Sequence, residues 1–224
     1  MDLKSTGVVI PAYNAEKTIG SIIKEVIAFG FDADKIIVVD DGSKDMTKKI
    51  AADLRLSVVH HKKNMGKGAA LRSGFELARS RNLRATVTLD ADGQHKVADL
   101  SGFLEHKNDY DLIVGLRNFN ITTMPFLRKM TNRTTSLVVS LLSNKYIADT
   151  QCGYRYINLA IFDNVDLKTK NFQTESELVV KAVRHNYRVG FVPITAVYNS
   201  EKSYIHPLID TIRFIIMVVR FLWR

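Results

Sequence analysis

Two acidic residues spaced two positions apart at the end of a predicted strand, Asp90 and Asp92, could bind a metal ion together. They follow a short run with β-branched residues, 86–88, which predicts a buried strand. In an extended chain the side chains at positions i and i+2 point the same way, so both carboxylates can face one pocket. Two carboxylates repel each other unless a cation lies between them, and Mg²⁺ typically takes one or two carboxylates together with substrate phosphates. The simpler alternative is a strand followed by an acidic turn.

Polar side chains also follow two earlier predicted strands. A Tyr-Asn pair at 13–14 comes after the run 6–10, and an Asp-Asp pair at 40–41 comes after the apolar run 35–39. Ligands of a parallel sheet bind outside the carboxyl ends of its strands. We therefore expect these groups and the acids at 90–92 to converge at one edge. The acids at 40–41 could instead cap the helix that follows them, but capping explains two adjacent acids poorly.

The hydrophobic pattern predicts an α/β fold with a mostly parallel central sheet flanked by helices, because strands and helices alternate along the chain. The expected strands span 6–10, where Pro11 is expected to end the first strand, 35–39, 56–59, 85–89, 109–116, 153–157 and 189–198. The expected helices span 16–29, a short segment that ends near residue 54, 69–80 and 174–186.

The composition limits the class of protein and its partners. The chain has 224 residues, 46% of them hydrophobic and 25% charged, which is ordinary for a globular protein with a real core. Its formal net charge of +9 suits a partner that carries phosphates, such as a nucleotide or an anionic membrane. No nucleic-acid recognition motif accompanies this charge, so we expect no nucleic-acid partner. The single Cys152 excludes an internal disulfide, and without a signal peptide we expect a cytoplasmic setting.

Several motifs, in this order and spacing, resemble family 2 glycosyltransferases of the GT-A fold. They are Val9-Ile-Pro-Ala-Tyr-Asn14, Val38-Val-Asp-Asp-Gly-Ser-Lys-Asp45, Asn64-x-Gly-Lys-Gly68 and Asp90-Ala-Asp-Gly-Gln-His95. Asp149-Thr-Gln-Cys-Gly-Tyr-Arg155 and Glu175-x-Glu177 are similar to stretches of the polyprenyl-phosphate (dolichyl-phosphate) mannose, glucose and N-acetylglucosamine synthases. The resemblance covers residues 6 to about 203. The chain departs from that subfamily at Ala15, where an acid is more common, and Glu16 is the candidate substitute.

The resemblance implies a UDP- or GDP-linked sugar donor and Mg²⁺ or Mn²⁺ as cofactor. The implied metal ligands are Asp90, Asp92 and Gln94. The implied donor-binding residues are Pro11, Tyr13, Asn14, Glu16, Asp40, Asp41, Lys67, Asp90, Ala91 and Lys202, with Asp40 at the edge of the base. The implied catalytic residues are Asp92, Arg117, Arg128 and Asp149, and those for acceptor or sugar are Arg117, Arg128, Glu175 and Glu177.

The implied reaction moves a hexose, with inversion, to dolichyl or polyprenyl phosphate. A lipid monophosphate has a second pKa near ~6, so it is an anionic nucleophile at neutral pH and needs no general base. Planar guanidinium groups would position it. One alternative is a family 2 transferase that acts on a sugar hydroxyl of a glycan or glycolipid. Another is a nucleotidyltransferase or nucleotide-binding module, although a Gly-x-Gly-x-x-Gly dinucleotide motif is missing after the first strand.

Two apolar stretches with interspersed charges indicate contact with a membrane. The stretch 121–143 mixes large apolar residues with Arg128, Lys129 and Arg133, which is the composition of a helix that lies on a surface. A helix packed on the sheet is the alternative. The stretch 207–224 is interrupted by charges too often to span a bilayer, which requires ~20 predominantly apolar residues.

We therefore expect a GT-A catalytic domain at 1–203 and a C-terminal amphipathic helix at 204–224 that lies on the membrane. Trp223 and Arg224 would anchor this helix at the interface. The protein would then be peripheral on the cytosolic face. A core-packing helix, a chain cut before transmembrane segments, and a helix that binds a membrane protein or a second copy of the chain are the alternatives.

Overall fold

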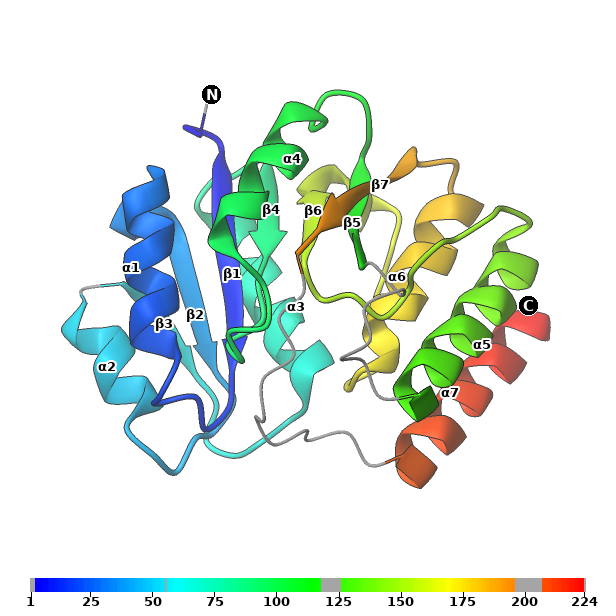
Figure 1. Cartoon of the computed structure of the whole chain (residues 1–224), viewed down its shortest axis with the longest axis horizontal. Coiled ribbons are helices and arrows are strands. Elements are labelled where there is room, and N and C mark those ends of the chain that lie inside the picture. The colour runs from blue at the N-terminus through cyan, green and yellow to red at the C-terminus, as the bar shows by residue number, and fades with distance from the viewer. Residues whose placement is uncertain (1–2, 55, 118–125, 196–206, 224) are drawn as a thin grey trace.

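The protein is an α/β structure in which one twisted sheet separates two groups of helices (Figure 1). The computed structural model describes residues 3–54, 56–117, 126–195 and 207–223, and at 126–128 and 207–208 it describes the backbone alone. Seven strands of the described residues form the sheet, in the order β3-β2-β1-β4-β6-β5-β7. Neighbouring strands are parallel except where β6 pairs with β4 and β5. The predicted, mostly parallel α/β sheet is confirmed.

The predicted elements occur in the predicted order, with ends that differ by a few residues, and the structure adds a short helix at Leu100–Glu105 that was not predicted. The strands are β1 Thr6–Ala12, β2 Ile36–Asp40, β3 Ser57–His60, β4 Ala85–Thr88, β5 Leu112–Arg117, β6 Arg155–Asn158 and β7 Val189–Ile194. The α-helices are α1 Ile19–Phe29, α2 Thr47–Asp53, α3 Lys67–Ser80, α4 Leu100–Glu105, α5 Phe126–Ser143, α6 Gln173–Arg184 and α7 Pro207–Leu222. The domain boundary predicted at 203–204 lies outside the described residues.

The first strand does not end at Pro11, and the prediction that it would was wrong. β1 continues to Ala12, with Pro11 paired opposite Val39 of β2. The Val9 carbonyl accepts a hydrogen bond from Leu89 on the β4 side, so the backbone polar groups of residue 11 face that side too. Because β4 ends at Thr88, the missing amide hydrogen of Pro11 removes no ladder bond, and the strand tolerates proline there.

The helices form layers around the sheet. Helix α3 lies against β1, β2 and β4, and its Gly74 lets the helix approach Val9 of β1 closely. Helices α3 and α6 touch, and α5 and α7 lie side by side against α6, farther from the sheet (Figure 1). Helix α1 packs against α2 and against the short turn before α4. The sheet is thereby covered on both faces, so its carboxyl edge is where loops can gather around a ligand.

The C-terminal helix α7 both packs on the protein and exposes apolar side chains. Its Met217 is buried, Phe214 and Phe221 pack against the core, and the Arg184 guanidinium of α6 lies 5.0 Å from the Phe221 ring centre. The outward side carries exposed apolar residues, namely Ile209, Ile212, Ile215, Ile216, Val219, Leu222 and Trp223. Among the described residues, none of the helices has the length and apolar character needed to span a bilayer.

Candidate active site

The loops after β1, β2 and β4 meet at the carboxyl edge of the sheet. The Asn14 amide donates to the Ser43 hydroxyl (2.9 Å), and the Lys44 amide donates to the Asn14 side-chain oxygen (2.9 Å). The Thr18 hydroxyl donates to the backbone oxygen of Ala91 (2.5 Å). The predicted convergence is confirmed, and Asn14 and Ala91 help to hold the loops together.

An ion triad lies at the centre of this edge. Lys67 Nζ is 2.6 Å from Asp90 Oδ1 and 2.9 Å from Glu175 Oε1, and all three side chains are largely buried. Burial works to lower the pKa of Lys67 and to raise that of Asp90, but the attraction between the charges outweighs it. The pKa of Lys67 is therefore raised and the pKa of Asp90 lowered. At neutral pH the triad holds an ammonium group between carboxylates.

Backbone geometry brings the triad together. Lys67 is the first residue of α3 and follows Gly66, whose φ of +94° is in the left-handed region that favours glycine. Asp41 accepts hydrogen bonds from the amides of residues 65 and 66 (2.9 and 2.8 Å) and so fixes this turn. A side chain at Gly153 would overlap both the Asp90 carboxylate and Lys67 Nζ. Glycine at 153 is therefore needed for the chain to approach the ion pair.

His95 lies against Asp90 and was not among the predicted site residues. Its Nε2 is 3.9 Å from Asp90 Oδ2, and its ring is tilted against Tyr154 with the ring centres 5.3 Å apart. Burial lowers the pKa of His95 to about 4, so the imidazole is neutral at physiological pH. The ring atom Nδ1 is buried and has no hydrogen-bond partner in the described part of the chain. The position of His95 directly after the acidic motif was the signal available in the sequence.

A second buried ion pair lies at the end of β5. Arg117 donates from Nε to Asp149 Oδ2 (2.7 Å) and from Nη2 to Asp149 Oδ1 (2.8 Å). Asp149 Oδ1 also accepts from the Gln151 amide (2.9 Å). Both carboxylate oxygens thus bind protein groups, and Asp149 fixes the plane of the guanidinium. Burial acts to raise the pKa of Asp90, whereas the charge of Lys67 and, more weakly, that of Arg117 act to lower it.

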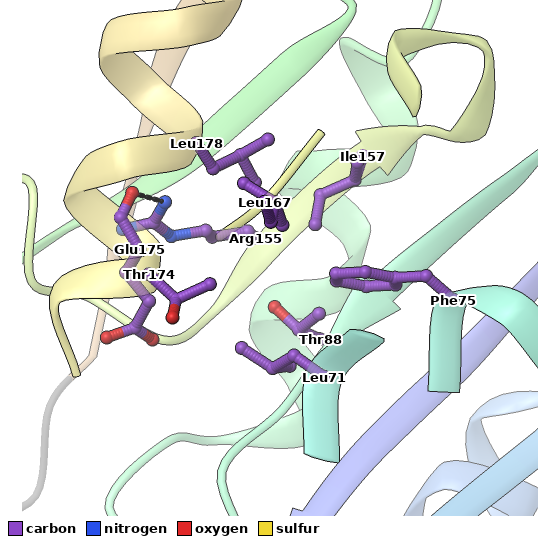
Figure 2. A pocket seen from close by; sticks show the side chains of 9 residues that line it. All are labelled: Leu71, Phe75, Thr88, Arg155, Ile157, Leu167, Thr174, Glu175 and Leu178. Carbon is purple, nitrogen blue, oxygen red and sulfur yellow. Dashed lines mark hydrogen bonds between the residues drawn. The ribbon is translucent and has the colours of Figure 1, made fainter. Parts of the chain in front are cut away.

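Arg155 ties the segment before β6 to the start of α6. Its guanidinium donates to the backbone oxygens of Cys152 (2.7 Å), Glu175 (2.6 Å) and Thr150 (2.7 Å), and its side chain is buried. Figure 2 shows the bond to Glu175 beside a cavity lined mainly by apolar side chains of the core, namely Leu71, Phe75, Ile157, Leu167 and Leu178. The sequence prediction missed this role, although Arg155 closes one of the motifs. The cavity belongs to the core beneath the ion triad.

The residue types of the predicted metal ligands suit a divalent cation. Asp92 Oδ1 accepts the amide of Gln94 (2.9 Å), which orients the carboxylate two residues beyond Asp90. Carboxylate and amide oxygens are the donors that hard cations prefer, and the ammonium of Lys67 shows that this position accepts positive charge. Within the described ranges, His, Cys, Asp and Glu side chains form no group of three suited to a metal. Substrate oxygens would therefore have to complete the coordination.

Two adjacent histidines at the end of β3 pair with the two acids at the end of β2. His60 Nδ1 lies 2.7 Å from Asp40 Oδ2, and His61 Nδ1 lies 2.7 Å from Asp41 Oδ1. The register of the strands sets Asp40 opposite His60. Asp40 is fully buried, and its Oδ1 accepts the Ser43 amide (3.1 Å). Sequence reasoning missed the histidines, although the matching His-His and Asp-Asp pairs at successive strand ends were visible.

The remaining predicted residues divide into loop supports and residues at the edge. Glu16 is exposed and accepts the Met46 amide (3.0 Å). Glu177 accepts from the amides of residues 168–169 (2.8 to 3.1 Å) and lies 2.6 Å from Lys181 Nζ, so it holds a loop. Pro11 and Ala91 are buried and Tyr13 is half-buried at the carboxyl edge. The Arg128 side chain and Lys202 lie outside the described residues.

Comparisons with known proteins agree with this geometry. The family model described as Glycosyl transferase family 2 matches residues 7–165. The UDP-N-acetylglucosamine–dolichyl-phosphate N-acetylglucosaminyltransferase of Methanococcus voltae is 30% identical over 214 residues, covering 85% of this chain and 84% of that protein. The polyprenol monophosphomannose synthase of Mycolicibacterium smegmatis is 30% identical over 203 residues, covering 85% and 76%.

A similar fold occurs in glucosyl-3-phosphoglycerate synthase from Mycobacterium tuberculosis, crystallised with Mn²⁺, UDP and glucosyl-3-phosphoglycerate. The TM-score is 0.74 at 17% identity, and the match covers 97% of this chain and 78% of that one. At this identity the likeness shows the fold alone. The GT-A fold predicted from the motifs is confirmed.

Proposed function

We propose that this chain, which belongs to glycosyl transferase family 2, transfers a hexose with inversion from a UDP- or GDP-linked sugar to dolichyl or polyprenyl phosphate. The observation that carries the proposal is the presence of two buried cations at the carboxyl edge of the sheet, Lys67, which lies 2.6 Å from Asp90, and Arg117, which is held by Asp149 at the end of β5. Both substrates bring phosphates to the reaction, and buried cations are suited to bind them. The names of the relatives from M. voltae and M. smegmatis support the lipid phosphate as acceptor.

On the donor side, Asp90, Asp92 and Gln94 would hold Mg²⁺ or Mn²⁺, which neutralises the diphosphate as it leaves. Fold relatives crystallised with UDP and Mn²⁺ or Mg²⁺ support this assignment. Lys67 would meet the same diphosphate because its ammonium lies against Asp90. Lys202 is proposed to close over the donor.

The base would lie on the loops after β1, β2 and β3, where Tyr13 and Asn14 also stand. Asp40 is fully buried, whereas 36% of the His60 side chain is exposed. Because Nδ1 of His60 faces the Asp40 carboxylate, Nε2 is the ring nitrogen that can meet a ligand. We propose that the Asp40–His60 pair reads the edge of the base, with Asp40 fixing the tautomer and orientation of His60.

On the acceptor side, Arg117 and Arg128 would position the lipid phosphate. Asp149 holds the Arg117 guanidinium in one plane, which suits the directional recognition of phosphate oxygens. The anionic phosphate attacks the anomeric carbon itself, so no side chain has to remove a proton. We assign Glu175 to hold Lys67, and Glu177, whose oxygens bind residues 168–169 and Lys181, to support the loop.

The acceptor lipid places the reaction at a membrane. The outward side of α7 exposes Ile212, Ile216 and Trp223, and α5, which contacts α7, exposes Leu137 and Leu141. Exposed apolar side chains that gather on neighbouring helices mark an interaction surface. We propose that this surface inserts shallowly into an anionic membrane, on the cytosolic face, without crossing it. A second copy of the chain or a membrane protein on α7 is the other outcome that a binding assay can reveal.

The test is product identity. The purified protein is incubated with UDP- and GDP-linked hexoses, Mn²⁺ and a short polyprenyl phosphate, and products are identified by mass spectrometry and acid lability. We expect an acid-labile lipid monophosphate sugar with one donor base strongly preferred. Transfer only to sugar hydroxyls of a glycan or glycolipid, with polyprenyl phosphate inert across all donors, would replace this proposal by the alternative of a glycan-directed transferase.

A further inference from the structure

The contacts around Asp90 bear on how a metal ion reaches it. Asp90 Oδ1 lies 2.6 Å from Lys67 Nζ. The carboxylate also faces Gly153, where any side chain would overlap it, and its Oδ2 lies 3.9 Å from His95 Nε2. Protein groups therefore line both oxygens of a residue that we assign to metal binding. A divalent cation that coordinates Asp90 through Oδ1 would therefore compete with the ammonium group of Lys67 for that oxygen.

We infer that Lys67 and the divalent cation exchange at Asp90, and that Glu175 keeps Lys67 in the site when the metal displaces it. The inference rests on the proposed function, because it takes Asp90 as a metal ligand. Glu175 Oε1 is 2.9 Å from the same Nζ, and its side chain is 5% exposed. Lys67 can therefore leave Asp90 without becoming an unpaired buried charge, which would be strongly unfavourable.

The charges of the group favour exchange over simultaneous binding. Two cations on one buried carboxylate repel each other, and this repulsion is much stronger in a largely buried site than in water. His95 does not contribute a positive charge near neutral pH, because burial lowers its pKa to about 4. Once Lys67 has turned to Glu175, Asp90 and Asp92 can face the metal together. The ammonium then remains nearby as a second positive charge for the leaving diphosphate.

The exchange implies that the metal and the nucleotide bind cooperatively. When no nucleotide is present, a metal ion that displaces Lys67 leaves it paired with Glu175 and brings no further counter-ion for it. A diphosphate supplies oxygen ligands to the metal and a further anionic partner to Lys67. We therefore expect the protein alone to bind the metal weakly and to bind it more tightly when UDP or GDP is present.

The test measures Mn²⁺ binding to the protein alone by the loss of the free Mn²⁺ signal in electron paramagnetic resonance. Lys67→Met removes the competing cation, so the dissociation constant for Mn²⁺ should fall by roughly tenfold. Glu175→Gln leaves Lys67 with Asp90 as its carboxylate partner, so Mn²⁺ should bind several-fold more weakly. Lys62→Met, which removes an exposed lysine from the same loop, is the matched control and should leave the constant unchanged.

The double variant separates exchange from simple charge effects. If Lys67 and the metal exchange at Asp90, Glu175→Gln should have a much smaller effect in the Lys67→Met background than in the unaltered protein. Equal effects in both backgrounds would show that the two charges act independently, and the inference would fail. Thermal unfolding checks each variant, and Lys67→Gln, which keeps a hydrogen-bond donor, replaces Lys67→Met if the latter does not fold.

The two proposals fail in different ways. Mn²⁺ binding that is unchanged or weaker in Lys67→Met overturns the exchange and leaves the proposed function intact. No Mn²⁺ binding by any variant, with or without UDP and GDP, contradicts the metal requirement of the proposed function and this inference with it. Binding by Lys67→Met but not by the unaltered protein supports the exchange in its strongest form.

Discussion

Arg117 and Asp149, which are 32 positions apart in the sequence, form a buried bidentate ion pair with N···O distances of 2.7 and 2.8 Å. Arg117 ends β5 and Asp149 stands in the segment before β6, so the pair joins two parts of the carboxyl edge. Because the guanidinium is planar and its two donors are fixed, its direction is set before any phosphate reaches it. In the proposed function, the position of the acceptor therefore depends on Asp149, a residue that we do not expect to touch it.

Replacing Arg117 by lysine should impair transfer strongly although the charge is kept. Lysine cannot reproduce the two parallel hydrogen bonds to Asp149, so the phosphate loses its fixed partner, and a displacement of this kind can cost roughly 10²-fold. The measurement is kcat/KM with polyprenyl phosphate at saturating donor. Arg79→Lys, at the exposed pair with Asp163, is the control and should change nothing. If Arg117→Lys is as active as Arg79→Lys, Arg117 does not position the acceptor.

Removing the acidic motif should abolish metal-dependent transfer without unfolding the protein. We expect Asp92→Ala to be inactive and Asp90→Ala to be severely impaired, because the diphosphate then lacks its counter-ion. EDTA should stop the reaction, and added Mn²⁺ should restore it. Asp109→Ala, at an exposed acid paired with His106, is the control. Full activity in the presence of EDTA would contradict the prediction.

The Asp40–His60 pair should set the affinity for the nucleotide. Asp40→Ala should weaken UDP or GDP binding by ~1.5–3 kcal/mol, the range for a hydrogen bond that involves a charged group. His60→Phe keeps an aromatic ring but removes both nitrogens. It should weaken nucleotide binding by a similar amount if His60 contacts the base. Isothermal titration calorimetry measures both, with His106→Phe as an exposed control. Unchanged affinity in His60→Phe would show that His60 does not contact the base, which would then be bound by other residues at the carboxyl edge.

Glu177→Gln should lower stability rather than activity, in contrast to Glu175→Gln. Burial works to raise the pKa of Glu177, but hydrogen bonds from Lys181 and Thr169 outweigh it, so the pKa is below its usual 4.5. The folded state therefore binds the proton less tightly than the unfolded state. The stabilisation is complete above pH 4.5 and is lost as the pH falls below it. We expect a loss of about 2–3 kcal/mol at pH 7 in urea unfolding, and a smaller loss in acid. An equal loss at both pH values would show that the charge is not the cause.

Introducing acidic residues on the outward face of α7 should release the protein from membranes. Ile212→Glu with Ile216→Glu places two acids on the exposed side, so both desolvation and repulsion by anionic lipid oppose binding. Flotation with anionic liposomes measures the bound fraction, which should also fall partly at high salt. Met46→Glu, an exposed apolar residue before α2, is the control. These substitutions are preferable to deleting α7, because its buried Met217 supports the fold. If the double variant floats like the unaltered protein, α7 is not the membrane-binding surface.

The sequence predicted the element order and the meeting of strand ends because both follow from local pattern and from the geometry of parallel sheets. It could not distinguish Glu175 from Glu177, since both stand in one short motif at the start of α6. Their roles differ only because Lys67 reaches one and residues 168–169 reach the other. The pairing of His60 with Asp40 likewise depends on strand register, which no local pattern specifies. Pro11 was misjudged because its tolerance depends on where a neighbouring strand ends.

Strand β6 runs in the opposite direction to its neighbours, so its two ends lie toward opposite edges of the sheet. This determines where an insertion in the chain could alter the candidate active site. Since β6 is antiparallel to β4 and β5, its first residue, Arg155, lies beside Thr88 and Val114 near the carboxyl edge, and Asn158 lies toward the opposite edge. The four residues of β6 span roughly 13 Å. Insertions just before β6 would therefore reshape the candidate active site, whereas insertions just after it would fall on the far side.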